Sequence, residues 1–189
     1  MKTLSELMQN PTVHVLLDIL RLSNTETYEH SYHVAVFVEE MLHETGYNDS
    51  EKEEILIGCL LHDIGKAFIP LNLMQLPQSL SEEQHNIIKV HTSVSYEIVK
   101  NVFSEIVQNI CLLHHERIDG SGYMSHRIKE EIPDYVLLMQ VADVFDALIS
   151  PRRYNKEYTK ERAIEILHKE VEANKLDRAY VDLLESKIN

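Results

Sequence analysis

Residues 49–70 read DSEKEEILIGCLLHDIGKAFIP, and this stretch predicts the centre of the fold. Asp49 or Ser50 can cap a helix, and the apolar residues that follow are spaced as in one buried helix that ends at the glycine of HDIGK. His62 and Asp63 fall at the end of this helix. An imidazole and a carboxylate are thus expected side by side at the end of a buried helix.

The helical pattern continues through the rest of the chain. Its 189 residues contain only five glycines and five prolines, and no alternation of apolar and polar residues indicates a strand. We therefore expect an all-α bundle, with residues 1–24 as N-terminal helices packed on a core domain of residues 25–189. A short helix should precede Pro11, and further helices are expected at about 12–22, 25–45 (stopped by Gly46), 49–65, 81–91, 92–103, 105–115, 133–149, 159–173 and 178–187.

Composition excludes several classes of partner. The chain has 18 Lys and Arg against 31 Asp and Glu, a net charge of −13, and such a protein binds DNA, RNA or an anionic membrane poorly. No apolar run approaches the roughly 18 residues of a membrane span. The first residues, MKTLSELMQN, lack the features of a signal peptide, so we expect a cytoplasmic protein. Cys59 and Cys111 lie in apolar helical runs, which predicts buried thiols rather than a disulfide.

Eleven histidines are the strongest chemical signal. A single histidine on a helix is more often structural than functional, so the argument depends on a combination of motifs. HDIGK (62–66), HHERIDGSGY (114–123) and ADVFDA (142–147) follow one another with helix-length gaps. Imidazoles and carboxylates together suit Mn, Fe or Zn rather than calcium, which prefers oxygen ligands.

These motifs, with TYEHSYHVA (27–35), SEEQHNIIKVHTSVSYEIV (81–99) and RRY (152–154), resemble the HD-GYP family. This branch of the HD phosphohydrolase superfamily hydrolyses cyclic di-GMP and related cyclic dinucleotides. The run HHE-x-x-DG-x-GY separates it from other HD phosphohydrolases. The resemblance covers residues 25–185 and implies an HD-domain helical bundle with a metal cluster in its core.

The resemblance also implies a role for each matching residue. The metal ligands would be His30, His62, Asp63, His91, His114, His115 and Asp143. Asp63 would bridge two ions, and Lys66 would contact the scissile phosphate, which makes these two the expected catalytic residues. The expected substrate-binding residues are Lys66, Asp119, Gly120, Gly122, Tyr123, Asp146 (in a supporting role) and Arg152.

Three positions leave alternatives open. Some family members hold a third metal with a glutamate at the position of Glu26, but an acid at a helix start is also favoured by the helix dipole. Met124 replaces the proline of the family motif, which affects the conformation of the Gly-Tyr loop or a protein partner bound there. Asn155 replaces a basic residue, which affects the affinity for the dinucleotide.

We therefore expect a phosphodiesterase with two or three divalent ions, Fe or Mn, which activate water and bind phosphate oxygens. Its substrate would be cyclic di-GMP or a related cyclic dinucleotide, and its product the linear dinucleotide and then GMP. Two other interpretations stay open: a catalytically weak module that binds the dinucleotide, and another HD-type nucleotide phosphohydrolase.

Overall fold

The computed structural model describes residues 1–74, 81–150 and 158–188. Within these ranges the chain is helical and has no strand, only an isolated antiparallel bridge between Asp119 and Ile128, so the predicted all-α class is confirmed. No helix in these ranges combines the length and the apolar character needed to cross a membrane. The helices are α1 (Leu4–Met8), α2 (Pro11–Ser23), α3 (Thr25–Leu42), α4 (Asp49–Leu61), η1 (Ile64–Phe68), α5 (Leu71–Met74), α6 (Glu82–Lys89), α7 (His91–Val99), α8 (Glu105–Leu113), η2 (Lys129–Glu131), α9 (Asp134–Ile149), α10 (Lys160–Glu172) and α11 (Arg178–Ile188).

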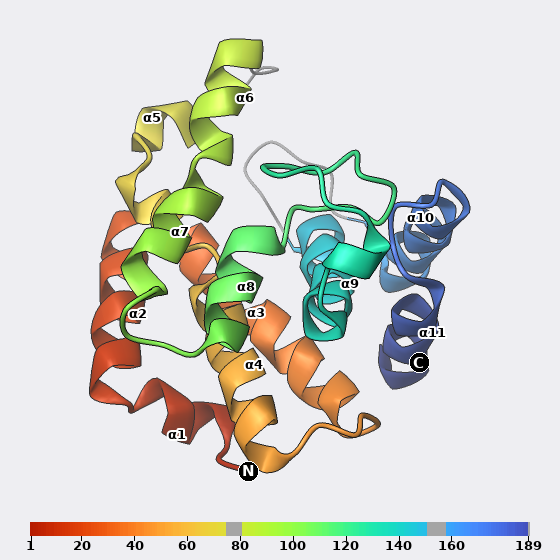
Figure 1. The fold of residues 1–189 in the computed structure, drawn as a ribbon, viewed down its shortest axis with the longest axis horizontal. Helices are drawn as coiled ribbons and strands as arrows, with labels where there is room; N and C mark the ends of the chain where they lie inside the picture. Colours follow the sequence, from red (N-terminus) through yellow and green to blue (C-terminus); the bar gives the residue numbers. More distant parts are fainter. Residues whose placement is uncertain (75–80, 151–157, 189) are drawn as a thin grey trace.

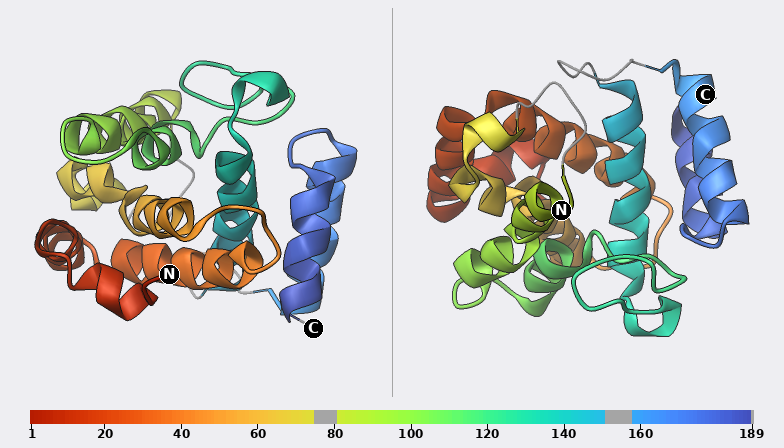
Figure 2. Two further views of the ribbon diagram at one scale, coloured as in Figure 1. Left: turned by 60° about the horizontal axis from the view of Figure 1, so that its bottom comes forward. Right: turned by 90° about the horizontal axis from the view of Figure 1, so that it is seen from above.

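Helices α3, α4, α8 and α9 form the centre of the molecule (Figure 1). On one side α1 and α2 pack against α3 and α4, and on the other side α10 and α11 pack against α9 (Figure 2). The α7 helix lies across η1 and α8. The C-terminal ends of α4 and α8, the second turn of α3 and the middle of α9 thus come together near the loop of residues 117–132.

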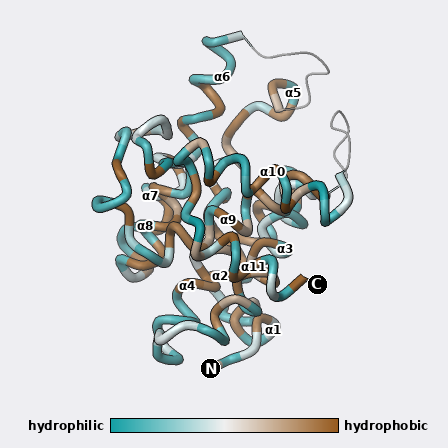
Figure 3. The backbone as a smooth tube through the Cα atoms, turned by 90° about the vertical axis from the view of Figure 1, so that its right-hand side faces the viewer, coloured by the Kyte–Doolittle hydropathy of each residue, from teal (hydrophilic) through white to brown (hydrophobic). Residues whose placement is uncertain are grey.

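The central helices bury most of their apolar side chains in one core. Figure 3 shows hydrophobic segments concentrated inside the bundle, whereas α6 extends away from its body. Phe145 of α9 is fully buried and meets Phe37 of α3 edge to face, with 5.1 Å between ring centroids. Burying a side chain of this size contributes about 1.5–3 kcal/mol. Cys59 and Cys111 are buried and unpaired, as predicted, and burial raises the pKa of both thiols.

Several helix boundaries differ from the predictions: α4 ends at Leu61 rather than at Gly65, and α7 ends at Val99 rather than at Phe103. Asn48, not Asp49 or Ser50, caps α4: its side chain accepts a hydrogen bond from the Glu51 N–H, and the Glu51 carboxylate accepts one from the Asn48 N–H. The α3 helix ends at Leu42, three residues before the predicted Thr45. Asparagine caps helices as well as aspartate or serine does, so sequence alone did not separate these neighbours.

Gly65 lets η1 lie directly against α7. Its N–H donates to Ser95 Oγ at 2.9 Å, and a Cβ on this residue would come within 2.2 Å of the His91 carbonyl oxygen and 2.8 Å of Ser95 N. Both of these atoms belong to helical backbone, which cannot move aside as a side chain can. The glycine of HDIGK therefore keeps Asp63 close to His91.

A Gly65→Ala variant should be less stable than the wild type by about 1–3 kcal/mol, because the new methyl group overpacks against helical backbone. Urea denaturation followed by circular dichroism measures this difference. Gly46→Ala is the matched control, since a Cβ at Gly46 meets nothing within 4 Å. Equal stability of the two variants would show that the close approach at Gly65 is not required.

Candidate metal centre

Three histidines are oriented by carbonyl groups at helix ends. The Nδ1 of His62 donates to Cys59 O at 2.7 Å, and that of His91 donates to Ile88 O at 2.7 Å. The Nδ1 of His114 lies 3.1 Å from the carbonyl oxygens of residues 110 and 111. These carbonyls belong to the last turns of α4, α6 and α8, and a carbonyl oxygen has two lone pairs, so it can accept a ring N–H in addition to a backbone N–H. Since a carbonyl only accepts, the proton sits on Nδ1 in each neutral ring, and Nε2 keeps its lone pair.

The three Nε2 atoms surround the carboxylate of Asp63. Oδ1 lies 3.2 Å from His91 Nε2 and 3.6 Å from His114 Nε2, while Oδ2 lies 3.3 Å from His62 Nε2. Burial opposes ionisation of Asp63, but the ammonium of Lys66 and the ring of His62 hold its pKa well below the usual value. Burial lowers the pKa of His114 to about 4, so that ring is neutral at pH 7.

His30 enters the same centre from the second turn of α3. Its Nε2 lies 2.9 Å from Asp143 Oδ1 and its Nδ1 lies 2.6 Å from Asp146 Oδ2, both on α9. Burial opposes protonation of His30, yet its hydrogen bonds to these two carboxylates raise its pKa to about 9. Asp143 Oδ1 also lies 3.8 Å from His62 Nε2, which links this pair to the ring at the end of α4.

Asp146 holds the ring of His30 in position from α9. Its side chain is 1% exposed, and it accepts a hydrogen bond from Ser150 Oγ at 2.7 Å in addition to the one from His30. These contacts agree with the supporting role expected for Asp146, and its predicted part in substrate binding stays a prediction. A carboxylate on the second nitrogen of a histidine fixes the ring and raises its basicity toward a metal.

Lys66 reaches the centre from η1. Its Nζ donates to Asp63 Oδ2 at 2.6 Å. An ammonium has three N–H donors, so this bond leaves two for a phosphate oxygen.

The donor set fits divalent metal ions. The side chains form two groups whose donor atoms lie within 4.8 Å of one another, and Asp63 belongs to both: Asp63, His91, His114 and His115 in one, and His30, His62 and Asp63 in the other. His62 Nε2 and Asp63 Oδ1 are buried without a hydrogen-bond partner. Leaving such atoms unsatisfied is costly, and a metal ion supplies the missing partner. Imidazole nitrogens with carboxylate oxygens suit Mn, Fe or Zn.

His115 contacts Tyr123, which belongs to the 117–132 loop. Their rings stack with 4.7 Å between centroids and 27° between planes, and Tyr123 N donates to His115 O at 3.1 Å. Burial and the neighbouring histidines lower the pKa of His115 well below its usual value, so it is neutral and able to ligate. Gly122 permits this arrangement, because a Cβ there would lie 2.4 Å from the backbone at Glu116 and Arg117.

Glu116 organises the loop, a role that the sequence analysis missed. This acid is fully buried, and its two oxygens accept hydrogen bonds from Ser125 N at 2.7 Å and Arg127 N at 3.0 Å. Gln140 of α9 donates to the Glu116 carbonyl at 2.8 Å. The available signal was an acid directly after two ligand histidines, at the start of a long loop.

The remaining predicted residues lie around the centre. Asp119 is exposed and accepts from Ser121 N at 2.9 Å, and Gly120 has φ +76°, so both shape the turn of the loop. Glu26 is exposed in the first turn of α3, four residues before His30, and belongs to neither metal-binding group. Arg152 and Asn155 lie outside the described residues.

Comparison with known proteins gives the family. Residues 14–180 match the family model described as HD domain, which is most of the chain. The chain belongs to the HD domain family. The match begins within the segment 1–24 that was predicted to precede the domain, and that division of the chain stays a prediction.

Relatives of this HD domain are cyclic dinucleotide phosphodiesterases by name. The chain is 38% identical over 143 residues to the cyclic di-GMP phosphodiesterase response regulator RpfG of Xanthomonas campestris pv. campestris. This match covers 74% of the chain and 37% of the relative. The chain is 37% identical over 146 residues to a cyclic di-GMP phosphodiesterase of Thermotoga maritima, covering 74% of the chain and 40% of the relative. The chain spans about two fifths of the length of these relatives. Their names support the predicted resemblance to the HD-GYP family.

Solved structures share the fold. Bd1817, an HDG"Y"P protein from Bdellovibrio bacteriovorus, has a TM-score of 0.72 at 24% identity, over 97% of this chain and 59% of that one. The HD domain of the Listeria monocytogenes phosphodiesterase PgpH in complex with cyclic-di-AMP has a TM-score of 0.65 at 21% identity, over 91% of this chain and 93% of that one.

Replacing Glu116 by glutamine should loosen the loop, because one backbone N–H then loses its acceptor inside the protein. We expect a loss of about 1–3 kcal/mol of stability and faster amide hydrogen exchange in residues 117–127. Glu130→Gln is the matched control, since Glu130 is exposed in the same loop. Unchanged exchange in Glu116→Gln would contradict the assigned role.

Proposed function

We propose that this chain is a metal-dependent phosphodiesterase that hydrolyses cyclic di-GMP or a related cyclic dinucleotide to the linear dinucleotide and then to GMP. The observation that carries this proposal is the position of Asp63, one oxygen of which faces His91 and His114 while the other faces His62. A carboxylate shared in this way suits two divalent ions in one site. The named activities of the relatives, which act on cyclic di-GMP or 3'3'-cGAMP, agree with this chemistry.

The proposed ligands divide between two ions. Asp63, His91, His114 and His115 would hold one, and His30, His62, Asp63 and Asp143 the other. We propose Fe or Mn, in keeping with the mixed imidazole and carboxylate donors. When bound, such ions supply Lewis acidity toward the phosphate and lower the pKa of water.

The other side chains complete the site. Lys66 would donate its remaining N–H groups to an oxygen of the scissile phosphate and stabilise the negative charge that grows there. Asp143 and Asp146 keep the His30 ring in position from α9. Because the whole chain carries a net charge of −13, attraction of an anionic substrate depends on local cations of this kind.

Other parts of the proposal rest on the resemblance alone. The residues that would contact the substrate are Asp119, Gly120, Gly122, Tyr123 and Arg152. A protein partner would bind at the Gly-Tyr loop, where the Met124 side chain is 43% exposed. We expect the reaction to take place in the cytoplasm, without nucleic acid or membrane.

The direct test is incubation of the metal-loaded protein with cyclic di-GMP, 3'3'-cGAMP, cyclic di-AMP and a nucleoside monophosphate, followed by chromatography of the products. We expect a linear dinucleotide from at least one cyclic substrate. Binding without hydrolysis would indicate a dinucleotide-binding module instead. Hydrolysis of the monophosphate alone would indicate another HD-type phosphohydrolase.

An Asp63→Asn variant should lose both metal and activity. The amide preserves the shape but removes the charge that both ions share, so activity should fall by more than the roughly 10–100-fold typical of residues that only support a ligand. Elemental analysis and the chromatographic assay measure the two losses. Asp134→Asn, the same change at an exposed position of α9, should leave both unchanged. Full metal content in Asp63→Asn would refute the shared carboxylate.

The predicted role of Glu26 has its own test. If its carboxylate holds a third ion, protein purified anaerobically should contain three ions per chain and a Glu26→Gln variant two. Elemental analysis gives both numbers. Two ions in both proteins would show that Glu26 is a helix-start acid, worth about 0.3–1 kcal/mol through the helix dipole.

A further inference from the structure

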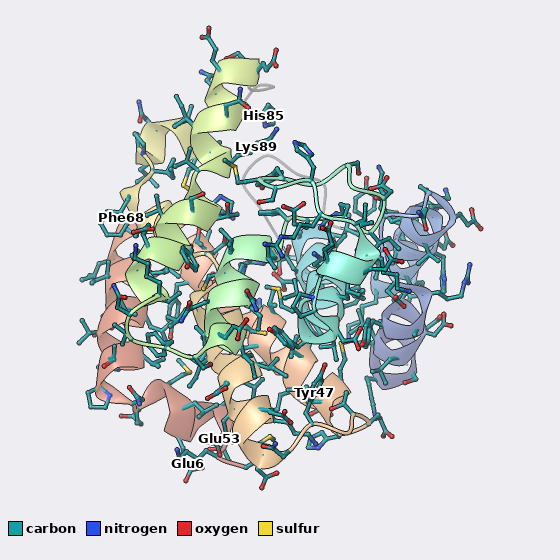
Figure 4. The ribbon with its side chains drawn as sticks, viewed as in Figure 1. Glu6, Tyr47, Glu53, Phe68, His85 and Lys89 are labelled. Carbon is teal, nitrogen blue, oxygen red and sulfur yellow. The ribbon has the colours of Figure 1, made fainter. Side chains whose placement is uncertain are left out.

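A second lysine lies beside the metal centre. Lys89 is the last residue of α6, and its Nζ lies 5.3 Å from the centroid of the Tyr123 ring. Tyr123 in turn stacks on His115, so Lys89 is linked through one aromatic ring to a proposed ligand. Figure 4 shows Lys89 on the side of α6 that faces the 117–132 loop.

The position of Lys89 is tied to the metal centre through the backbone. The carbonyl of Ile88, the residue before it, accepts the hydrogen bond from His91 Nδ1. Otherwise α6 packs mainly against α7 and extends away from the body of the molecule. The last turn of α6, which carries Lys89, is thus hydrogen-bonded to a proposed ligand.

The ammonium of Lys89 is available to an anion. Among the residues that the structure describes, no carboxylate forms an ion pair with it, whereas Lys66 is bonded to Asp63 and the guanidinium of Arg117 donates to two backbone carbonyls. An aromatic ring attracts the cation by about 0.5–1 kcal/mol at exposed sites, but it does not occupy the three N–H donors as oxygen acceptors would.

We propose that Lys89 binds the second phosphate of the cyclic dinucleotide, the one that is not being hydrolysed. This inference rests on the proposed function. A cyclic dinucleotide carries two phosphodiesters on opposite sides of its ring, and only one can lie at Asp63 and Lys66. The other keeps its negative charge in a protein of net charge −13, and Lys89, held by Tyr123, supplies a cation for it.

A substrate with a single phosphodiester tests this inference. We would compare cyclic di-GMP with bis(p-nitrophenyl) phosphate in wild type, Lys89→Met and Lys89→Arg. Lys89→Met keeps the aliphatic stem and removes the charge. Its KM for cyclic di-GMP should rise about tenfold, which equals about 1.4 kcal/mol of binding, with kcat within about twofold of the wild type and a weaker dependence of KM on salt.

The same variant should cleave bis(p-nitrophenyl) phosphate as the wild type does, and Lys89→Arg should restore the KM for cyclic di-GMP. Lys52→Met is the matched control, because it removes one lysine charge from the first turn of α4, at the other end of that helix from His62. It should leave both substrates unaffected.

The contrary outcomes are distinct. An unchanged KM for cyclic di-GMP in Lys89→Met, or an equal loss of rate on both substrates, would overturn the inference and leave Lys89 as a support for Tyr123. A wild type that cleaves bis(p-nitrophenyl) phosphate but none of cyclic di-GMP, 3'3'-cGAMP and cyclic di-AMP would overturn the proposed function, and this inference with it.

Discussion

A hydrogen bond from the Nδ1 of a histidine to a carbonyl at a helix end occurs three times around Asp63, and the rest of the centre depends on it. In each case the carbonyl lies in the last turn of a helix, and its two lone pairs let it accept the ring N–H even where it also accepts a backbone N–H. The bond fixes both the orientation and the tautomer of the ring, so that the lone pairs of His62, His91 and His114 are directed toward the same carboxylate. The bundle brings the ends of α4, α6 and α8 together, and the metal-binding geometry follows from where these helices end.

This arrangement has a cost in the absence of metal. His62 Nε2 and Asp63 Oδ1 are buried without a hydrogen-bond partner, and charged or polar atoms in that state destabilise a fold. The Lys66 ammonium, the close approach at Gly65 and the core around α9 offset this cost. Because the proposed ligands already lie together, metal binding should stabilise the folded chain by mass action.

Helical periodicity is a local signal, so the sequence predicted most of the helices. The seven His and Asp residues that the resemblance implied as ligands lie together in the structure, and their role as ligands stays a prediction. The sequence did not predict what depends on contacts between distant segments. Glu116 acts on backbone groups nine and eleven residues away, and Asp146 is bonded to a histidine 116 residues earlier in the chain. The contact of Lys89 with the Tyr123 ring depends on how α6 lies relative to the 117–132 loop, which no local pattern predicts. The cap of α4 was missed by one residue because Asn48, Asp49 and Ser50 have similar capping strength.

The central claim is that Asp63 is shared by two metal ions. Anomalous diffraction from a crystal of the Mn- or Fe-loaded protein, recorded at the absorption edge of that metal, tests it most directly. The account predicts two peaks roughly 3.5–4 Å apart, one beside His91 and His114 and the other beside His30 and His62, with the Asp63 carboxylate between them. A single peak, or two peaks that Asp63 does not bridge, would contradict it.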